Sequence, residues 1–484
     1  MNTDTTRLQR MATGVSGLDA VLGGGLPELS FSLIAGPPGS GKTTLAHQIM
    51  FALASPERPA LYFTVLGEPP LKMLRYQQQF EFFEHERVKD SIRFISLADE
   101  AASGDLDKVL ARISSEVEAH APGLVFVDSF RSVAGSPARA GIPSLGLQHF
   151  IQNLGVLMTC WQATTFLVGE YFTPNDPNPV FTVADGLIWL SQSVQGNSVV
   201  RKLEIIKMRG QATVPGLHTF RIGSAGITVF GPPPSLALLA DAGHGLAERL
   251  PMGVPGLDRM MGGGLPRGYS LLVAGPSGSG KTLLAEAYLA EGARHGETGV
   301  IAAFEQRPRR PRSHRLADLI ASGQVGVVDT RAPDLSVDEM AMLLITEIRR
   351  LGASRVVIDS LSGFELALAP TFRNDFRQSL ARLVAALTGS GVTLLMTSEL
   401  EDRFTDLRFS PHGTAFLTDA IIVHRYVELT GRLLRALAVV KLRGSAHSDE
   451  LRLFHVDDDG LHIDERLAGH TGLLTGRPLR LPAD

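Results

Sequence analysis

The stretch GPPGSGKT at residues 36–43 occurs a second time, as GPSGSGKT at residues 275–282. Both fit the phosphate-binding loop G-x-x-x-x-G-K-[ST]. Each follows an apolar run that predicts a buried strand, at 31–35 and at 271–274, and each precedes a helical pattern. In that setting the glycines let backbone N–H groups curl around phosphate oxygens, and the helix N-terminus adds a partial positive charge. The sequence therefore predicts two nucleotide sites in one chain.

The chemistry of the loop assigns roles to its side chains, with ATP and Mg2+ as the expected cofactors. The lysines would reach the β- and γ-phosphates, and the threonines that follow, Thr43 and Thr282, would each place a hydroxyl on Mg2+. The predicted nucleotide-binding residues are Gly39, Ser40, Gly41, Lys42, Thr43 and Thr44 in the first copy and Gly278, Ser279, Gly280, Lys281, Thr282 and Leu283 in the second.

Composition narrows the class of protein. The chain has 484 residues, 44% of them hydrophobic, and a formal net charge of -4, so its surface as a whole carries no field that attracts nucleic acid or an anionic membrane. The single cysteine, Cys160, excludes an internal disulfide framework, fits a reducing compartment and is expected to pack in the core beside Trp161. No signal-peptide core or apolar run of about 20 residues is present, so we expect a soluble cytoplasmic protein.

The repeat extends beyond the two loops. TGVSGLD at 13–19 and GGGLP at 23–27 recur as MGVPGLD at 252–258 and GGGLP at 262–266. The interval is the size of a domain rather than of a solenoid repeat. Three prolines at 232–234 cannot continue a strand, so we predict a first domain at 1–232, a linker at 233–247 and a second domain at 248–484.

Short apolar runs alternate with helical patterns in each copy. In the second copy, unbroken apolar runs at 300–304, 325–328, 356–358 and 392–396 are typical of a parallel sheet buried on both faces, and helical spacing occurs at 283–294, 336–351 and 372–389. Hairpin patterns follow in both copies, at 186–193 with 199–207 and at 420–429 with 432–441. The predicted fold class is α/β, with two tandem doubly wound, mostly parallel sheets, each extended by an antiparallel hairpin.

A P-loop ATPase also needs acidic residues at the ends of strands. Asp128 and Asp359 each follow an apolar run and are predicted to hold the water shell of Mg2+. For the group that activates the attacking water, the strand after the loop helix offers Glu305 in the second copy. Counted from the loop lysines without a gap, Leu66 lies opposite Glu305, so the first copy lacks this carboxylate unless Glu68, two residues later, replaces it.

Taken together, these motifs resemble the KaiC family of RecA-like ATPases over almost the whole chain. The resemblance also includes FEQRP at 304–308 and the K-[LM]-R-G segments at 207–210 and 441–444. It implies a double-ring homohexamer that holds ATP at subunit interfaces. It further implies that four basic residues reach the neighbour's γ-phosphate, and that His447, whose counterpart is Thr213, contacts nucleotide. The four are Lys207, Arg209, Lys441 and Arg443.

The chain departs from the clock members of this family where they autophosphorylate a Ser-Thr pair. Counting back from Leu417-Thr418-Asp419 places Ala415 and Phe416 at those acceptor positions. Thr414 and Thr418 are the nearby hydroxyl residues, so Ser/Thr autokinase activity is not an expected main function. An arginine cluster at 307–315 has no counterpart in this reading.

Three functions remain open from the sequence. The first is an ATP-hydrolysing homohexamer that works as a clock-like or signalling timer, with a KaiB-like or other signalling protein as its partner. The second is a RecA-like recombinase or helicase, supported only by the arginine cluster, since the segment at 131–144 offers few cations for a nucleic acid. The third is an ATP-binding scaffold whose first ring does not hydrolyse ATP.

Overall fold

The structure is a computed structural model that describes residues 9–65, 70–130, 144–174, 178–231, 248–304, 314–332, 334–400, 416–429, 431–466, 470–471 and 479–480. The chain divides into two compact units, Met1–Pro232 and Pro233–Asp484. The predicted linker at 233–247 lies outside the described residues. In the parts that are described, no helix is both long enough and apolar enough to cross a bilayer.

The first unit contains one large mixed sheet that ends in antiparallel strands. In spatial order its nine described strands are β11 (Gly226–Phe230), β10 (His218–Gly223), β9 (Ser198–Met208), β8 (Gly186–Gln195), β3 (Phe31–Gly36), β7 (Thr164–Glu170), β6 (Leu124–Asp128), β4 (Ala60–Thr64) and β5 (Ile92–Ser96). The strands from β8 to β5 run parallel, whereas β9, β10 and β11 join as antiparallel neighbours. A short antiparallel pair, β1 (Arg10–Met11) and β2 (Leu26–Pro27), precedes the sheet.

The second unit repeats this order. Its nine described sheet strands are β16 (Val325–Val328), β15 (Gly299–Ala303), β17 (Arg355–Asp359), β18 (Thr393–Glu399), β14 (Ser270–Gly275), β19 (Ala420–Leu429), β20 (Arg432–Leu442), β21 (Arg452–Asp457) and β22 (Gly460–Arg466). The short pairs are β12 (Arg249–Leu250) with β13 (Leu265–Pro266) and β23 (His470–Thr471) with β24 (Leu479–Arg480). Both sheets confirm the predicted fold class.

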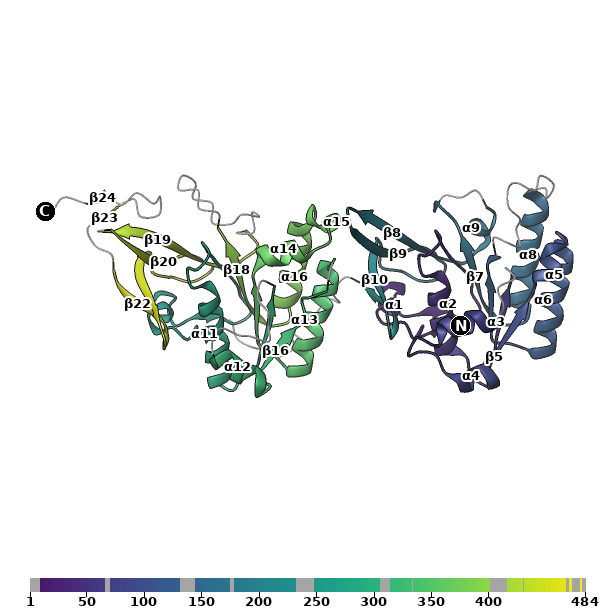
Figure 1. Cartoon of the computed structure of the whole chain (residues 1–484), viewed down its shortest axis with the longest axis horizontal. Coiled ribbons are helices and arrows are strands. Elements are labelled where there is room, and N and C mark those ends of the chain that lie inside the picture. Colours follow the sequence, from purple (N-terminus) through teal and green to yellow (C-terminus); the bar gives the residue numbers. More distant parts are fainter. Residues whose placement is uncertain are drawn as a thin grey trace, which may run out of the picture. The chain divides into compact units, whose positions relative to one another are not determined.

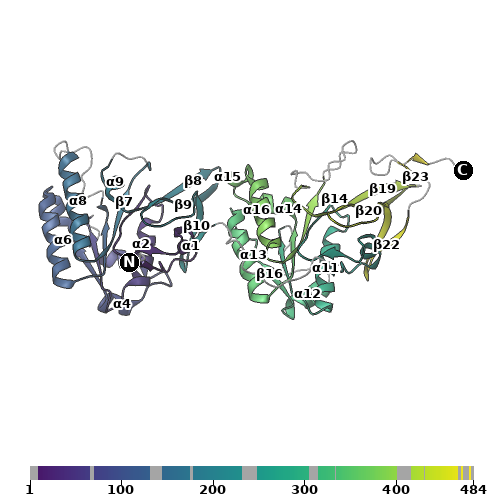
Figure 2. The same cartoon turned by 180° about the vertical axis from the view of Figure 1, so that it is seen from behind.

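Helices cover both faces of each sheet (Figures 1 and 2). In the first unit they are α1 (Leu18–Leu22), α2 (Lys42–Leu53), α3 (Pro70–Gln77), α4 (His85–Asp90), α5 (Ala98–Ala102), α6 (Leu106–His120), α8 (Ser144–Cys160) and α9 (Val180–Val183). In the second unit they are α10 (Pro255–Met260), α11 (Lys281–Arg294), α12 (His314–Ala321), α13 (Val337–Leu351), α14 (Leu361–Ala367), α15 (Pro370–Arg373) and α16 (Phe376–Thr388).

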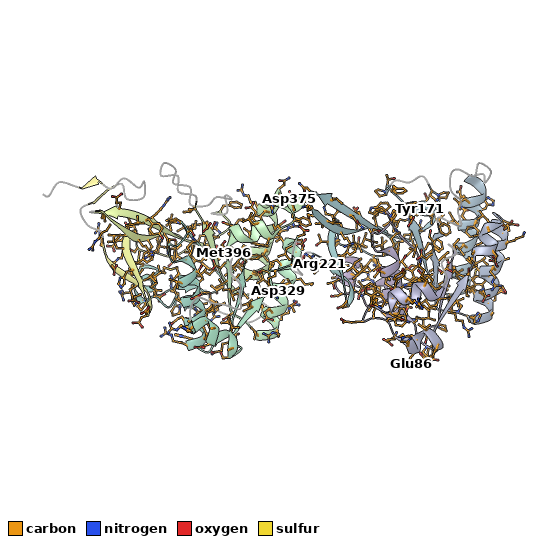
Figure 3. The ribbon with its side chains drawn as sticks, viewed as in Figure 1. Glu86, Tyr171, Arg221, Asp329, Asp375 and Met396 are labelled. Atoms are coloured by element: carbon orange, nitrogen blue, oxygen red, sulfur yellow. The ribbon has the colours of Figure 1, made fainter. Side chains whose placement is uncertain are left out.

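The core of each unit has two layers because its central strands are apolar on both faces. Helices α6 and α8 pack side by side over one face of the first sheet, as α13 and α16 do in the second unit (Figures 1 and 2). Met396 on β18, labelled in Figure 3, belongs to the layer under α13 and α16. The unbroken apolar runs of the sequence thus become the doubly covered parallel strands.

Local signals explain where the helices begin and end. Helix α13 starts after Ser336, whose hydroxyl accepts a hydrogen bond from the Glu339 N–H at 3.0 Å, and ends at Gly352 in a left-handed conformation. The predicted helix at 372–389 is wrong in its first part, since α15 ends at Arg373 and α16 starts only at Phe376. The apolar period of α16, with Leu380, Leu383 and Leu387 buried, begins there.

The prediction for Cys160 is wrong as well. Its side chain is exposed at the end of α8, because the buried face of that helix carries Ile151, Leu154 and Met158, and Cys160 lies two residues past the last of these. The apolar run around Trp161 therefore marked the end of an amphipathic helix and not a fully buried segment.

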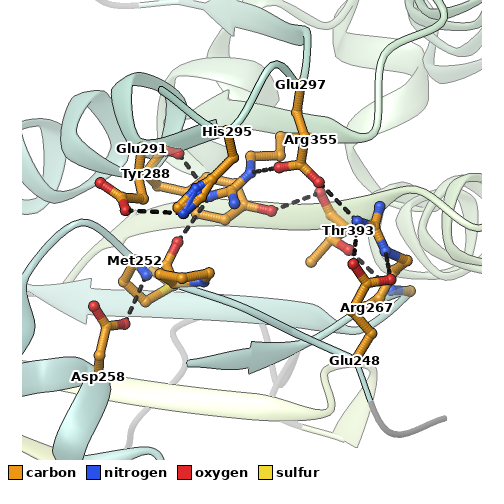
Figure 4. Close-up of polar contacts among 12 residues, drawn as sticks. Glu248, Met252, Asp258, Arg267, Tyr288, Glu291, His295, Glu297, Arg355 and Thr393 are labelled. Carbon is orange, nitrogen blue, oxygen red and sulfur yellow. Dashed lines mark hydrogen bonds and ion pairs between the residues drawn. The ribbon is translucent and has the colours of Figure 1, made fainter. Parts of the chain in front are cut away.

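A buried ion network lies at the start of β17 (Figure 4). The Arg355 side chain is only 1% exposed and donates to Glu297 Oε2 at 2.5 Å and to the Pro251 and Tyr288 carbonyls at 2.8 and 2.9 Å. Arg267 donates to Glu297 Oε1 at 2.7 Å and continues to Glu248. Burial alone would raise the pKa of Glu297, but the hydrogen bonds and charges of Arg355 and Arg267 lower it below its ordinary value.

The first unit has no such network at the equivalent position. Strand register pairs Arg355 with Gly299 and, in the first unit, Leu124 with Ala60. Leu124 is fully buried. The two units thus fill the same place in one fold with an arginine in one case and a leucine in the other.

Candidate nucleotide sites

Each phosphate-binding loop connects the central strand of its sheet to a helix. Strand β3 leads into α2, and β14 leads into α11, with Gly41 and Gly280 just before the helices at φ 101° and 91°. A side chain is disfavoured there by this left-handed backbone. At Gly41 a Cβ would also lie 2.9 Å from the Ile222 side chain. The glycines therefore let the loop turn tightly against the antiparallel strands.

The antiparallel strands hold the loops from the side. The Gln192 amide on β8 donates to the Gly39 carbonyl at 2.5 Å, and the Tyr426 hydroxyl on β19 donates to the Ser277 carbonyl at 3.3 Å. In the second unit, Phe454 and Leu461 of β21 and β22 lie closest to Gly280. The hairpin extensions are thus part of the wall of the site.

The loop lysines point into the curl of their own loops. Lys42 Nζ donates to the Pro37 carbonyl at 2.8 Å, and Lys281 Nζ donates to the Gly275 and Pro276 carbonyls at 2.9 and 2.8 Å. Burial lowers the pKa of Lys42, and the charges of Glu170 and Asp128 act against that shift. Each ammonium group is therefore held where phosphate oxygens bind in loops of this class.

The threonine and aspartate predicted to hold Mg2+ meet in both units. Thr43 Oγ1 donates to Asp128 Oδ2 at 2.9 Å, and Thr282 Oγ1 donates to Asp359 Oδ2 at 2.8 Å. Burial raises the pKa of Asp128, although hydrogen bonds from Tyr62 and Thr43 oppose the shift. A hydroxyl and a carboxylate side by side are hard oxygen donors, so the residues present fit a magnesium ion.

A cavity opens at each loop. The first measures about 470 Å³ and the second about 200 Å³. The first is lined by Gly39, Gly41, Lys42, Thr43, Thr44, Thr64, Met73, Tyr76, Gln77, Asp128, Ser129, Glu170 and Ile222. The second is lined by Ser277, Gly278, Gly280, Lys281, Thr282, Leu283, Glu286, Asp359, Ser360, Glu399, Arg435 and Val456. The Ser40 and Ser279 side chains are fully buried beneath the loops.

Two glutamates in these cavities were missed by the sequence reasoning. Glu170 ends β7 and Glu399 ends β18, and each lies opposite the last residue of the loop strand, Gly36 or Gly275. Strands β7 and β18 run between the loop strand and the strand that ends in the aspartate. Both carboxylates therefore lie between the phosphate loop and the predicted metal ligands. The repeat places them at equal positions, a signal that alignment of the two copies would have detected.

The predicted catalytic carboxylates cannot be placed. Glu68, Leu66 and Glu305 lie outside the described residues, directly beyond β4 and β15. Of the arginine cluster only Arg315 is described, at the start of α12. Thr414 also lies outside, and the fully buried Thr418 accepts a hydrogen bond from Lys441 Nζ at its carbonyl, at 2.6 Å.

The basic residues after the hairpins lie at the opposite edge of the sheet from their own loop. Lys207 pairs with Leu187, and Lys441 pairs with Ile421, at the beginning of β8 and β19. Those strands run parallel to β3 and β14, whose far ends carry the loops. A six-residue strand spans roughly 17 Å. A unit therefore cannot bring these cations to its own phosphate loop without breaking its sheet.

Each basic pair is anchored near the start of its loop strand. Arg443 Nη1 donates to Asp419 Oδ1 at 3.2 Å, and Asp419 Oδ2 accepts the Ser270 N–H at 3.0 Å. In the first unit, Arg209 and Asp185 make the same arrangement with the Phe31 N–H. The predicted residue His447 is half-buried in the loop that follows Arg443, away from the cavity of its own unit.

A parallel sheet with a phosphate loop after its central strand, and with a threonine–aspartate pair beside that loop, defines a P-loop ATPase fold, here present twice. The family model described as the KaiC ATPase matches residues 11–233 and again residues 250–468. The chain therefore belongs to the KaiC family; it is an ATPase and binds nucleotide.

Curated relatives match along nearly the whole chain. The circadian clock oscillator protein KaiC 1 of Synechocystis sp. is 28% identical, over 99% of this chain and 93% of the relative. The circadian clock oscillator proteins KaiC of Picosynechococcus sp. and Rippkaea orientalis are 27% and 26% identical, over 99% of this chain and 94% and 93% of those proteins.

Proposed function

We propose that this chain hydrolyses Mg2+-ATP at sites that a second copy completes, within a double-ring homohexamer. In this proposal Lys42, Thr43 and Asp128 hold the nucleotide and metal of the first ring, and Lys281, Thr282 and Asp359 do so in the second. The neighbouring copy supplies Lys207 and Arg209, or Lys441 and Arg443, to the γ-phosphate. Cations aimed at that phosphate stabilise charge that develops in the transition state.

The observation that supports this proposal is the separation of each loop from its own basic residues. Arg209 and Arg443 keep 60% and 53% of their side chains exposed, so both are accessible to another chain. They are held by carboxylates that also bind the first residue of the loop strand. Cations fixed at one edge and a phosphate site at the other suit a contact between successive copies.

The proposed role is a clock-like or signalling timer, by analogy with the printed names of the curated relatives. A KaiB-like or other signalling protein is the proposed partner, and the proposed location is the cytoplasm. Autophosphorylation is left out of the proposal, because Phe416 is 53% exposed at one expected acceptor position and the nearby Thr418 is fully buried.

Mixing two inactive variants tests the shared site. In a Lys42→Ala background, which silences the first ring, one variant also carries Lys281→Ala and the other Arg443→Ala. Each alone is expected to hydrolyse almost no ATP. In equal mixtures, roughly a quarter of the contacts pair an intact loop with an intact arginine, so about that share of turnover should return. If both variants assemble but their mixture stays inactive, Arg443 does not act on a neighbour.

The size of the particle with ATP and magnesium tests the ring. Six chains in one particle are expected, and a chain that stays monomeric at saturating nucleotide contradicts the proposal. Comparing turnover of Lys42→Ala with that of Lys281→Ala then tells whether the first ring hydrolyses ATP or only holds it.

A further inference from the structure

The two units secure the predicted metal-binding aspartate in different ways. In the first unit Asp128 Oδ2 accepts two hydrogen bonds, from Thr43 Oγ1 at 2.9 Å and from the Tyr62 hydroxyl at 2.7 Å. In the second unit the donors fall on different oxygens. Thr282 donates to Asp359 Oδ2 at 2.8 Å, and Thr397 Oγ1 makes a short hydrogen bond to Oδ1.

Strand register shows that this difference is an exchange between neighbouring strands. Tyr62 on β4 pairs with Phe126, two residues before Asp128, and Ile301 on β15 holds the equivalent place opposite Val357. On the other side of the aspartate, Val168 pairs with Ile34 of the loop strand. Thr397 holds that place in the second unit, opposite Val273.

Each unit therefore has one hydroxyl and one aliphatic side chain beside its aspartate. The first unit combines Tyr62 with Val168, and the second combines Ile301 with Thr397. All four side chains are buried, and none of the aliphatic ones can replace the missing donor. The chain thus keeps a second hydrogen bond to this carboxylate while changing the strand that provides it.

We propose that Tyr62 and Thr397 are positioning residues for Mg2+, each fixing the carboxylate plane of the aspartate in its own site. A carboxylate with one donor can rotate about its last bond, whereas a second donor fixes which oxygen faces the metal and its water shell. In the described part of the first unit both donors occupy Oδ2, so Oδ1 faces the metal side; in the second unit each oxygen carries one donor. The two sites therefore differ in how they bind Mg2+.

This inference rests on the proposed binding of Mg2+-ATP, and the test separates the two. In the full chain with Lys281→Ala, which leaves only the first site, binding of a fluorescent ATP analogue is followed as MgCl2 is added. Removal of a group that orients a metal ligand typically weakens metal binding about tenfold or more. Tyr62→Phe should therefore raise the half-saturating MgCl2 concentration by about tenfold.

Rescue by the solution that the other unit uses is the decisive measurement. Adding Val168→Thr to Tyr62→Phe supplies a donor from the opposite strand and should return the magnesium midpoint to within about threefold of the parent. Tyr76→Phe is the matched control, because it removes a hydroxyl from the same cavity that has no contact with Asp128. Its midpoint should not change. In a Lys42→Ala background, Thr397→Val should shift the second site in the same direction as Tyr62→Phe shifts the first.

The outcomes distinguish the possible failures. If the parent binds the analogue equally with and without MgCl2, the proposed metal site is wrong. If the parent requires MgCl2 and Tyr62→Phe leaves the midpoint unchanged, only the positioning role is wrong. If Tyr62→Phe lowers the melting temperature and Val168→Thr restores neither property, Tyr62 is a purely structural residue and the inference is also overturned.

Discussion

Removing Arg355 should destabilise the second unit and leave the first unit intact. Arg355→Ala deletes a buried cation, leaves the Pro251 and Tyr288 carbonyls without their donor, and leaves Glu297 with Arg267 alone. Breaking a buried ion pair from one side costs about 3–5 kcal/mol. Against a total stability of about 5–15 kcal/mol, the loss should be large. In a unit of this size it corresponds to a fall in melting temperature of roughly 10 °C.

The chain offers a built-in way to assign the effect. Its two tryptophans, Trp161 and Trp189, both lie in the first unit. Thermal unfolding of the full chain followed by tryptophan fluorescence therefore reports on the first unit, and circular dichroism reports on both. We expect the Arg355→Ala variant to unfold partly at lower temperature by circular dichroism, while its fluorescence midpoint stays within about 2 °C of the parent.

Two further variants sharpen the result. Arg350 makes two hydrogen bonds to Glu347, at 2.8 and 2.7 Å, on the surface of α13, so Arg350→Ala removes a comparable pair without burial and should change little. Arg355→Leu introduces the residue that the first unit has here and should be less harmful than alanine. If Arg355→Ala melts like the parent, or no worse than Arg350→Ala, the buried network does not stabilise the second unit.

Other predictions concern single carboxylates. Glu305→Gln in a Lys42→Ala background should lower phosphate release by about a hundredfold or more, as expected for loss of a general base; equal turnover removes Glu305 from the mechanism. Glu399→Gln should reduce turnover more than ATP affinity, because the carboxylate lies beside the phosphate loop; an effect on affinity alone would contradict this. The folded-state pKa of Glu297 is lowered, so its stabilising contribution is present above the ordinary value of 4.5 and lost as pH falls below it. The parent should lose more stability than Glu297→Gln between pH 6 and pH 4, measured by circular dichroism; parallel losses would refute this.

The fold could be predicted from the sequence because its signals are local and doubled. Unbroken apolar runs before Gly36 and Gly275 identified the central strands, and the loops identified the end of the sheet that binds phosphate. The pairing of Thr43 with Asp128 follows from that fold, because parallel strands carry their functional residues at one edge. The second hairpins, β10 with β11 and β21 with β22, were missed because they are short and partly polar.

What the sequence could not show depends on neighbours that are distant in the chain. Tyr62 appears to be an ordinary strand residue until the register places its hydroxyl on Asp128, 66 positions away. Arg355 resembles a surface residue at the start of a strand, and only the packing of Glu297 and Tyr288 around it reveals a buried cation. Cys160 failed for the opposite reason, since an apolar neighbourhood says nothing about which side of a helix a residue occupies.

The placement of each basic pair and each phosphate loop at opposite edges of one sheet has a consequence for assembly geometry. A contact that joins the two edges is head-to-tail, so a pair of chains using it always leaves one loop and one cation pair exposed at its ends. Only a closed circle of chains uses every edge. Catalytic output should therefore rise with the completion of rings and not in proportion to the number of paired chains.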